Sequence, residues 1–141
     1  MIPALEWLEH HANDLGIRTP GQFYWTTGAL SGVLDNAPTY LNFLTAASGL
    51  LAPAGSAPAA QTAFLVSEYP QYVRAISLGA VFFGAMTYIG NGPNFLVKSI
   101  ADRSKIRMPS FFGYIFKYSL PFLLPAFSLI WYVFLRTGSA F

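Results

Sequence analysis

The sequence contains no cysteine and few charged residues. Of its 141 residues, 10% are charged and 54% are hydrophobic, whereas a soluble domain usually carries about 25% charged residues. Without cysteine, the chain has no disulfides, no thiolate zinc site and no cysteine nucleophile. The net charge of +2 and the lack of a basic cluster interleaved with aromatic residues argue against nucleic acid as a partner. The composition therefore excludes an ordinary soluble domain and favours a membrane protein.

Two charge-poor segments, 74–98 and 110–136, are long enough to cross a membrane. Between their terminal residues, the first contains no charged residue and the second contains only Lys117. A helix needs ~20 mainly apolar residues to span the hydrocarbon core. Pro121 and Pro125 lie in the second segment, and membrane helices tolerate proline because neighbouring groups satisfy the freed carbonyls. We therefore predict a transmembrane helix in each segment.

The segment 21–51 has a different pattern, in which two apolar arms are separated by a polar turn. The arms 23–34 and 40–51 contain 12 residues each, which is about 18 Å of helix and little more than half of a ~30 Å hydrocarbon core. The turn between them reads Asp-Asn-Ala-Pro-Thr. We predict a re-entrant hairpin with its polar tip near mid-membrane. The alternative is one long helix bent at Pro38.

The remaining segments are predicted to lie at the membrane surfaces. Residues 1–20 contain ionisable side chains and leucines at helical spacing, which favours an interfacial amphipathic helix, with His10 and His11 solvated. Residues 52–73 begin with a turn-rich stretch and form an outer linker. Residues 99–109 belong to a basic loop that the positive-inside rule makes cytoplasmic.

The predicted fold is therefore all-α, and the chain is one polytopic membrane domain of residues 1–141. The predicted orientation places the hairpin opening at the outer face. The segment 74–98 then runs inward, and the segment 110–136 runs outward. We expect a multi-pass protein of the inner or plasma membrane whose first partner is the lipid bilayer.

The pattern Asn-x-Pro-(Thr/Asn)-aromatic-Leu occurs twice, at residues 36–41 and at residues 91–96. Proline fits the first turn of a helix but cannot continue one, so each motif predicts the end of one helix and the start of another. A helix broken at membrane depth leaves amides and carbonyls without partners, which is tolerated only inside protein or along a cavity. Two such breaks predict a shared site.

The residues at the two breaks supply oxygen ligands and one acid. Amide and hydroxyl oxygens suit an alkali cation, and the N-terminus of a broken helix suits an anion. Asp35 is the only acid in its apolar segment, and an acid inside a membrane usually marks an ion path, so we predict that it is a proton relay. The predicted ion- and substrate-binding residues are Ser31, Asn36, Pro38, Thr39, Thr87, Gly90, Asn91, Gly92 and Asn94.

Four of these residues are candidate Na+ ligands through their side-chain oxygens: Asn36, Thr39, Asn91 and Asn94. The alternative is that the asparagines only cap helix ends and join helices. No other metal site is predicted.

Residues 31–43, Ser-Gly-Val-Leu-Asp-Asn-Ala-Pro-Thr-Tyr-Leu-Asn-Phe, and the matching stretch 83–98 resemble the C-terminal repeat of the ion transporter superfamily. Within it, they are most similar to bacterial Na+/H+ antiporters and citrate-transporter-like membrane proteins. The resemblance implies a hairpin that opens from the outside, a broken helix and a final helix. It also implies that the first motif forms the hairpin tip and that the second forms the break facing it.

The resemblance favours Na+/H+ antiport for two reasons. The tip has Asp35 where the symporter branch has serine, and no arginine stands near either motif to bind a carboxylate. We therefore expect a secondary transporter rather than an enzyme, with Na+ and H+ as transported or coupling ions and no other cofactor. A citrate, dicarboxylate or arsenite carrier is the alternative, and a non-transporting membrane scaffold or assembly subunit is the alternative from another class.

Members of the superfamily contain two inverted repeats, and this sequence contains one. The resemblance therefore implies that an N-terminal inverted repeat is missing from this chain, and that the full-length protein is a homodimer with a small ion or anion as substrate.

Overall fold

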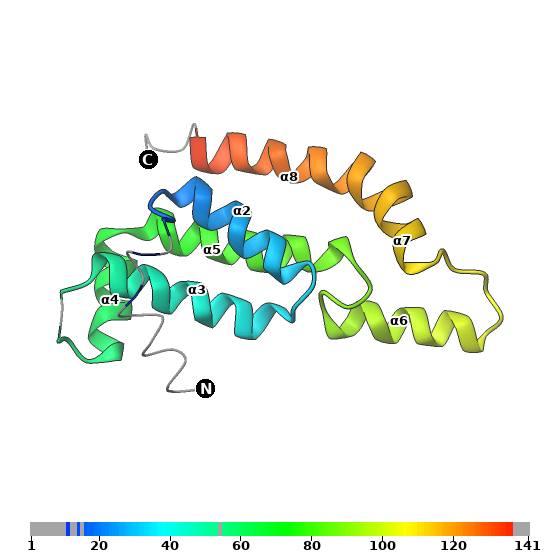
Figure 1. Ribbon diagram of the computed structural model, residues 1–141, viewed down its shortest axis with the longest axis horizontal. Coiled ribbons are helices and arrows are strands. Elements are labelled where there is room, and N and C mark those ends of the chain that lie inside the picture. The colour runs from blue at the N-terminus through cyan, green and yellow to red at the C-terminus, as the bar shows by residue number, and fades with distance from the viewer. Residues whose placement is uncertain (1–10, 12–13, 15, 54, 137–141) are drawn as a thin grey trace.

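The computed structural model describes residue 11, residue 14 and residues 16–53 and 55–136. This part of the chain contains helices and turns but no strand, which confirms the predicted all-α fold class (Figure 1). The predicted interfacial segment 1–20 falls mostly outside the described residues. In chain order the helices are α2 (Pro20–Ser31), α3 (Asn36–Leu51), α4 (Pro58–Glu68), α5 (Pro70–Phe83), the 3-10 turn η2 (Gly84–Met86), α6 (Gly92–Arg103), α7 (Phe111–Tyr114), η3 (Ile115–Leu123), α8 (Leu124–Trp131) and η4 (Tyr132–Arg136).

The last four of these elements form one continuous helix, Phe111–Arg136, which we call the final helix. It contains π-helical turns on both sides of α8, and Pro121 lies inside the first of them. Among the helices of the described residues, the final helix is the one long and apolar enough to cross a membrane. It corresponds to the transmembrane helix predicted at 110–136, whereas the other membrane-embedded segments stay predictions.

Residues 20–51 form a hairpin in which α2 and α3 run antiparallel, side by side (Figure 1). The chain leaves α2 after Ser31 and starts α3 at Asn36. Pro38 lies in the first turn of α3, where backbone N–H groups make no hydrogen bond within the helix, so proline is tolerated. The alternative of one long helix bent at Pro38 is therefore wrong. The re-entrant position of this hairpin in a membrane stays a prediction.

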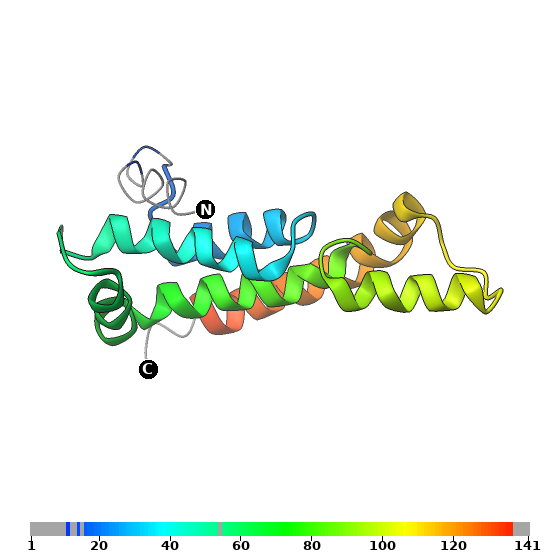
Figure 2. The same cartoon turned by 90° about the horizontal axis from the view of Figure 1, so that it is seen from below.

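The segment predicted as a broken span at 74–98 consists of two helices. α5 ends at Phe83, the turn η2 follows, residues 87–91 are non-helical, and α6 begins at Gly92. Figure 2 shows α6 continuing past the hairpin along the long axis of the molecule. The break lies where the second Asn-x-Pro motif predicts it. α6 contains no proline or glycine after Pro93 and runs on to Arg103, so the helix extends into the segment 99–109 predicted as a loop. The membrane boundary at residue 98 stays a prediction.

The predicted outer linker 52–73 contains the helix α4. Pro58 occupies the first turn of α4, where proline is favoured, and the next two residues are alanines, the best helix formers. Gln61 and Leu65 of α4 are buried. The linker therefore includes a packed helix, and its turn-rich part ends before Pro58.

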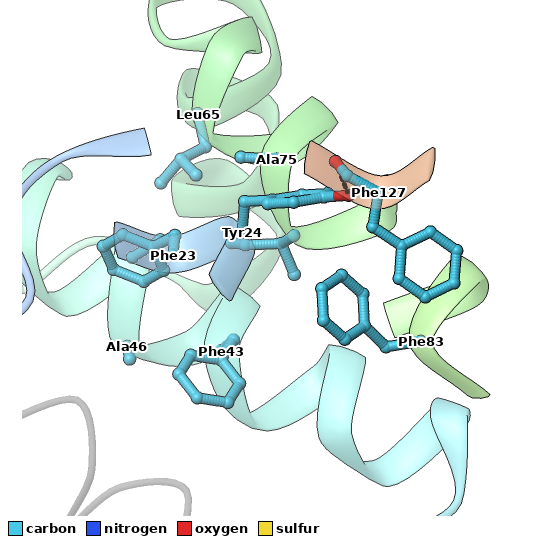
Figure 3. Packing of buried hydrophobic residues seen from close by; sticks show 10 residues of the cluster. Phe23, Tyr24, Phe43, Ala46, Leu65, Ala75, Phe83 and Phe127 are labelled. Carbon is cyan, nitrogen blue, oxygen red and sulfur yellow. Dashed lines mark hydrogen bonds between the residues drawn. The ribbon is translucent and has the colours of Figure 1, made fainter. Parts of the chain in front are cut away.

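The hydrophobic core lies where α2 crosses α5 and the final helix. Phe23 and Tyr24 of α2 are buried there, together with Phe83 of α5 and Phe127 of the final helix (Figure 3). The Tyr24 hydroxyl donates to Phe127 O at 2.9 Å. A Cβ on Gly79 would lie 2.5 Å from Tyr24 O, so the backbones of α2 and α5 touch without an intervening side chain. The α2–α5 contact thus fixes the position of the hairpin.

Gly79→Ala tests this close contact. The added methyl group would meet the Tyr24 carbonyl, and such overpacking costs about 1–3 kcal/mol. We therefore expect a clearly lower melting temperature, measured in detergent by circular dichroism. Gly92→Ala is the matched control, because nothing lies within 4 Å of a Cβ at that position. An equal melting temperature for both variants would contradict the assigned backbone contact.

Candidate functional site

Asn36, the first residue of α3, joins the two breaks. Its side chain lies against Gly84, where the helix of α5 ends, since a Cβ on Gly84 would fall on the Asn36 amide. In the amide orientation that matches donors to acceptors, Asn36 Nδ2 lies 3.0 Å from Ala80 O and 2.9 Å from Gly90 O. The same nitrogen lies 2.7 Å from Ser31 Oγ, which donates to Ala80 O at 2.5 Å. The first motif therefore contacts carbonyls on both sides of the second break.

Thr87 makes a second connection between the breaks. Its buried hydroxyl donates to Gly32 O, at the end of α2, over 2.6 Å, and accepts from Gly90 N at 2.9 Å and Ile89 N at 3.2 Å. A Cβ on Gly90 would lie 2.9 Å from Ser31 O and 3.0 Å from Gly32 O. Position 90 therefore has room only for glycine, because the backbones of the two breaks are in contact.

The asparagines of the second motif have structural partners. Asn91 caps α6, with its Oδ1 accepting from Asn94 N at 3.3 Å. The Asn94 side chain reaches back across the break, and its Nδ2 donates to Gly84 O at 3.0 Å and to Thr87 O at 3.4 Å. The two asparagines thus supply hydrogen-bond partners to backbone groups of the break from the start of α6.

The final helix satisfies two further carbonyls of the break. The Tyr114 hydroxyl donates to Ala85 O at 3.2 Å, and Ser119 Oγ donates to Met86 O at 2.6 Å. The Tyr114 ring also packs on Tyr88, with centroids 4.6 Å apart. Sequence reasoning did not select Tyr114 or Ser119. The one available signal was Ser119 itself, a polar residue in an apolar span that proves to be fully buried.

The other residues of the first motif make contacts within their own turn. Asp35 Oδ1 caps α3 by accepting from Asn36 N at 2.8 Å, and the Thr39 hydroxyl donates to Asp35 O at 2.9 Å. Pro38 belongs to the same turn. Asp35 is exposed, whereas Thr39 is buried. The structure therefore groups Ser31, Asn36, Thr87, Gly90 and Asn94 in one network and leaves Asp35 at its edge.

Two helices start at this site. α3 begins at Asn36 and α6 at Gly92, and the helices run in opposite directions away from the joined breaks (Figure 1). Neither has an acidic residue in its first turn, but the Asp35 carboxylate caps α3, so the N-terminus of α6 is the one with no acid beside it. Because a helix N-terminus carries a partial positive charge and free N–H groups, this arrangement favours an anion. Gly92 faces open space, so a ligand can approach the backbone there.

The predicted Na+ ligands are involved in hydrogen bonds of the fold. Asn36 and Asn94 use their amide nitrogens on backbone carbonyls, and the Asn91 oxygen caps a helix. Within the described residues, no group of three or more acidic, histidine or cysteine side chains forms a metal site. The geometry therefore supports the capping and joining role of the asparagines, and their role as Na+ ligands stays a prediction.

Comparison with protein families matches residues 1–135 to the family described as "Putative citrate transport". The chain belongs to this family. Among curated proteins and among solved structures, no match was found. Membership of the citrate transport family supports the predicted class of membrane transport protein and the citrate-transporter-like resemblance. It does not support Na+/H+ antiport, and it agrees better with the carrier alternative.

Thr87→Val tests the contact between the breaks. Valine has nearly the same shape but removes the donor to Gly32 O and the acceptor for two N–H groups. Loss of a buried partner costs about 1–3 kcal/mol, so we expect a lower unfolding midpoint in a denaturant titration. Thr45→Val is the control, because that exposed hydroxyl only bonds Leu41 O in its own helix. Equal midpoints would show that the Thr87 bonds contribute little.

Proposed function

We propose that the chain forms the substrate site of a secondary transporter for citrate or a related carboxylate. The observation that carries the proposal is the meeting of the α3 and α6 N-termini at the joined breaks, in a member of the citrate transport family. Discontinuous helices that point their N-termini at an anionic group are a recurrent way for transporters to bind substrate.

Gly92 supports an approach of the anion to α6. No atom lies within 4 Å of where a Cβ on Gly92 would be. The following residue is Pro93, which has no N–H. The Asn94 N–H is already bonded to Asn91 Oδ1. A carboxylate at this helix end would therefore bind close to the Gly92 backbone, where the dipole of α6 stabilises negative charge.

Asp35 supports coupling of the anion to a cation. Its exposed carboxylate lies at the N-terminus of α3, so it would repel a carboxylate substrate at the same site. A bound Na+ or a proton on Asp35 removes that repulsion. In the proposal Asp35 therefore binds the coupling ion, and the amide and hydroxyl oxygens predicted as Na+ ligands complete its coordination.

Na+/H+ exchange without an organic anion is the second candidate function. One observation favours it, namely that the hairpin turn carries an acid, Asp35, and that this acid is exposed at the edge of the site. It requires a proton flux that is driven by Na+ in vesicles free of citrate.

The proposal also includes the membrane arrangement. The hairpin of α2 and α3 enters the membrane without crossing it, α5 with α6 and the final helix cross it, and the loop after α6 is cytoplasmic. A second, inverted repeat, as the resemblance implies, would cover the open side of the site in a homodimeric transporter.

Gly92→Leu tests the anion site. The larger side chain fills the open space in front of the α6 N-terminus and should leave the fold intact. We expect citrate uptake into proteoliposomes under an inward Na+ gradient to fall about tenfold or more, which corresponds to a loss of ~1.4 kcal/mol of binding. Ser99→Leu, further along α6, is the control. Full uptake by Gly92→Leu would refute the proposed approach of the anion.

Asp35→Asn tests the coupling ion. Asparagine caps a helix as well as aspartate does, so the variant removes the charge and keeps α3. We expect citrate uptake to lose its dependence on the Na+ or proton gradient, whereas Glu68→Gln, at the end of α4, should retain it. Unchanged ion dependence would remove Asp35 from the mechanism. Na+-driven proton flux in citrate-free vesicles, abolished by Asp35→Asn, would favour the second candidate.

A further inference from the structure

The turn that ends α6 carries three exposed cations, Arg103, Lys105 and Arg107, and we call residues 103–107 the cationic turn. The acid nearest in sequence, Asp102, is paired with Lys98, whose Nζ lies 2.5 Å from its carboxylate. Among the described residues, none of the three cations has a side-chain hydrogen bond or an ion pair. The cationic turn is therefore an uncompensated patch of positive charge.

The backbone of the cationic turn places a lysine where glycine is usual. Ile106 N donates to Ala101 O at 3.0 Å and Lys105 N donates to Asp102 O at 3.1 Å, which is the Schellman pattern of a helix end. The residue after the cap in this pattern has a positive φ and is normally glycine. Here it is Lys105, with φ of 58°. A disfavoured conformation held by a charged residue at the tip of a turn points to a role for the charge.

Exposed apolar side chains occur within the cationic turn and shortly after it in sequence. Ile106 lies between Lys105 and Arg107 and is 59% exposed, and Phe112, just inside the final helix, is 68% exposed. The final helix, the candidate membrane span, begins at Phe111. In sequence, the cations thus directly precede a candidate span, and the turn itself contains an exposed apolar side chain, Ile106, that a lipid surface would cover.

We propose that the cationic turn binds the phosphate of anionic lipid headgroups. A cation cluster directly beside a membrane-spanning helix is attracted to anionic lipid by about 1 kcal/mol per charge, or about fivefold in affinity. The exposed Ile106 and Phe112 favour a headgroup over free phosphate, because a lipid covers apolar surface and a free ion does not. The proposal depends on the membrane location of the chain and is independent of the transported substrate.

Lipid competition tests the proposal. The purified protein, in neutral detergent, is mixed with equimolar phosphatidylglycerol and phosphatidylcholine of the same acyl chains, and native mass spectrometry counts the lipids retained. We expect a preference for phosphatidylglycerol that each of R103Q, K105Q and R107Q lowers about fivefold. K105R should retain the preference, and R74Q, which removes an exposed cation near the start of α5, is the matched control.

K105G separates the charge from the fold. Glycine relieves the positive-φ position, so the melting temperature should stay equal or rise while the lipid preference falls as in K105Q. Equal binding of both lipids by the wild type, a preference that survives the triple variant R103Q/K105Q/R107Q, or an equal loss in R74Q would overturn the proposal. Complete displacement of phosphatidylglycerol by equimolar inorganic phosphate would also overturn it and would identify a free phosphate site.

Discussion

The structure depends on the hydrogen bonds that replace those lost where two helices stop. A break inside an apolar environment is possible only if its amides and carbonyls find partners, and here each break supplies partners to the other. Asn36 of the first break lies within bonding distance of the Ala80 and Gly90 carbonyls, and Thr87 of the second bonds the Gly32 carbonyl. Neither break supplies all of these hydrogen-bond partners from its own residues. The hairpin and the α5–α6 helix pair are therefore held together at the site itself.

The same hydrogen bonds decide which ligands the site can accept. Side-chain nitrogens and hydroxyls occupy several of the carbonyls that a cation would otherwise use. The two helix N-termini remain, together with the unobstructed backbone at Gly92. In this site most carbonyl acceptors are occupied and the positive ends of two helix dipoles lie close together, which suits an anion. A cation is then needed mainly to neutralise the charge of Asp35. A cation that neutralises Asp35 would thus allow an anion carrier to have an acid beside its hairpin turn.

Much of the fold could be predicted from local chemistry, whereas the contacts of the site could not. The helix break at Pro93 was predictable because proline acts on its own turn, and so was the hairpin, because Pro38 and its polar neighbours interrupt an apolar run. The helix α4 was missed because the residues before Pro58 are rich in proline, glycine and alanine and resemble a linker. Pairings such as Ser119 with Met86 join residues far apart in sequence, and no local pattern contains that information.

The π-helical turns of the final helix explain how it reaches two consecutive carbonyls. Tyr114 and Ser119, which bond Ala85 O and Met86 O, are five positions apart. In a regular α-helix, residues with this spacing point about 140° away from each other. A π-helical segment, in which hydrogen bonds join residues five apart, brings both side chains to one face, and η3 has that form. The irregular winding of the final helix is thus matched to the irregular backbone of the break, and straightening the final helix would release a carbonyl of the break.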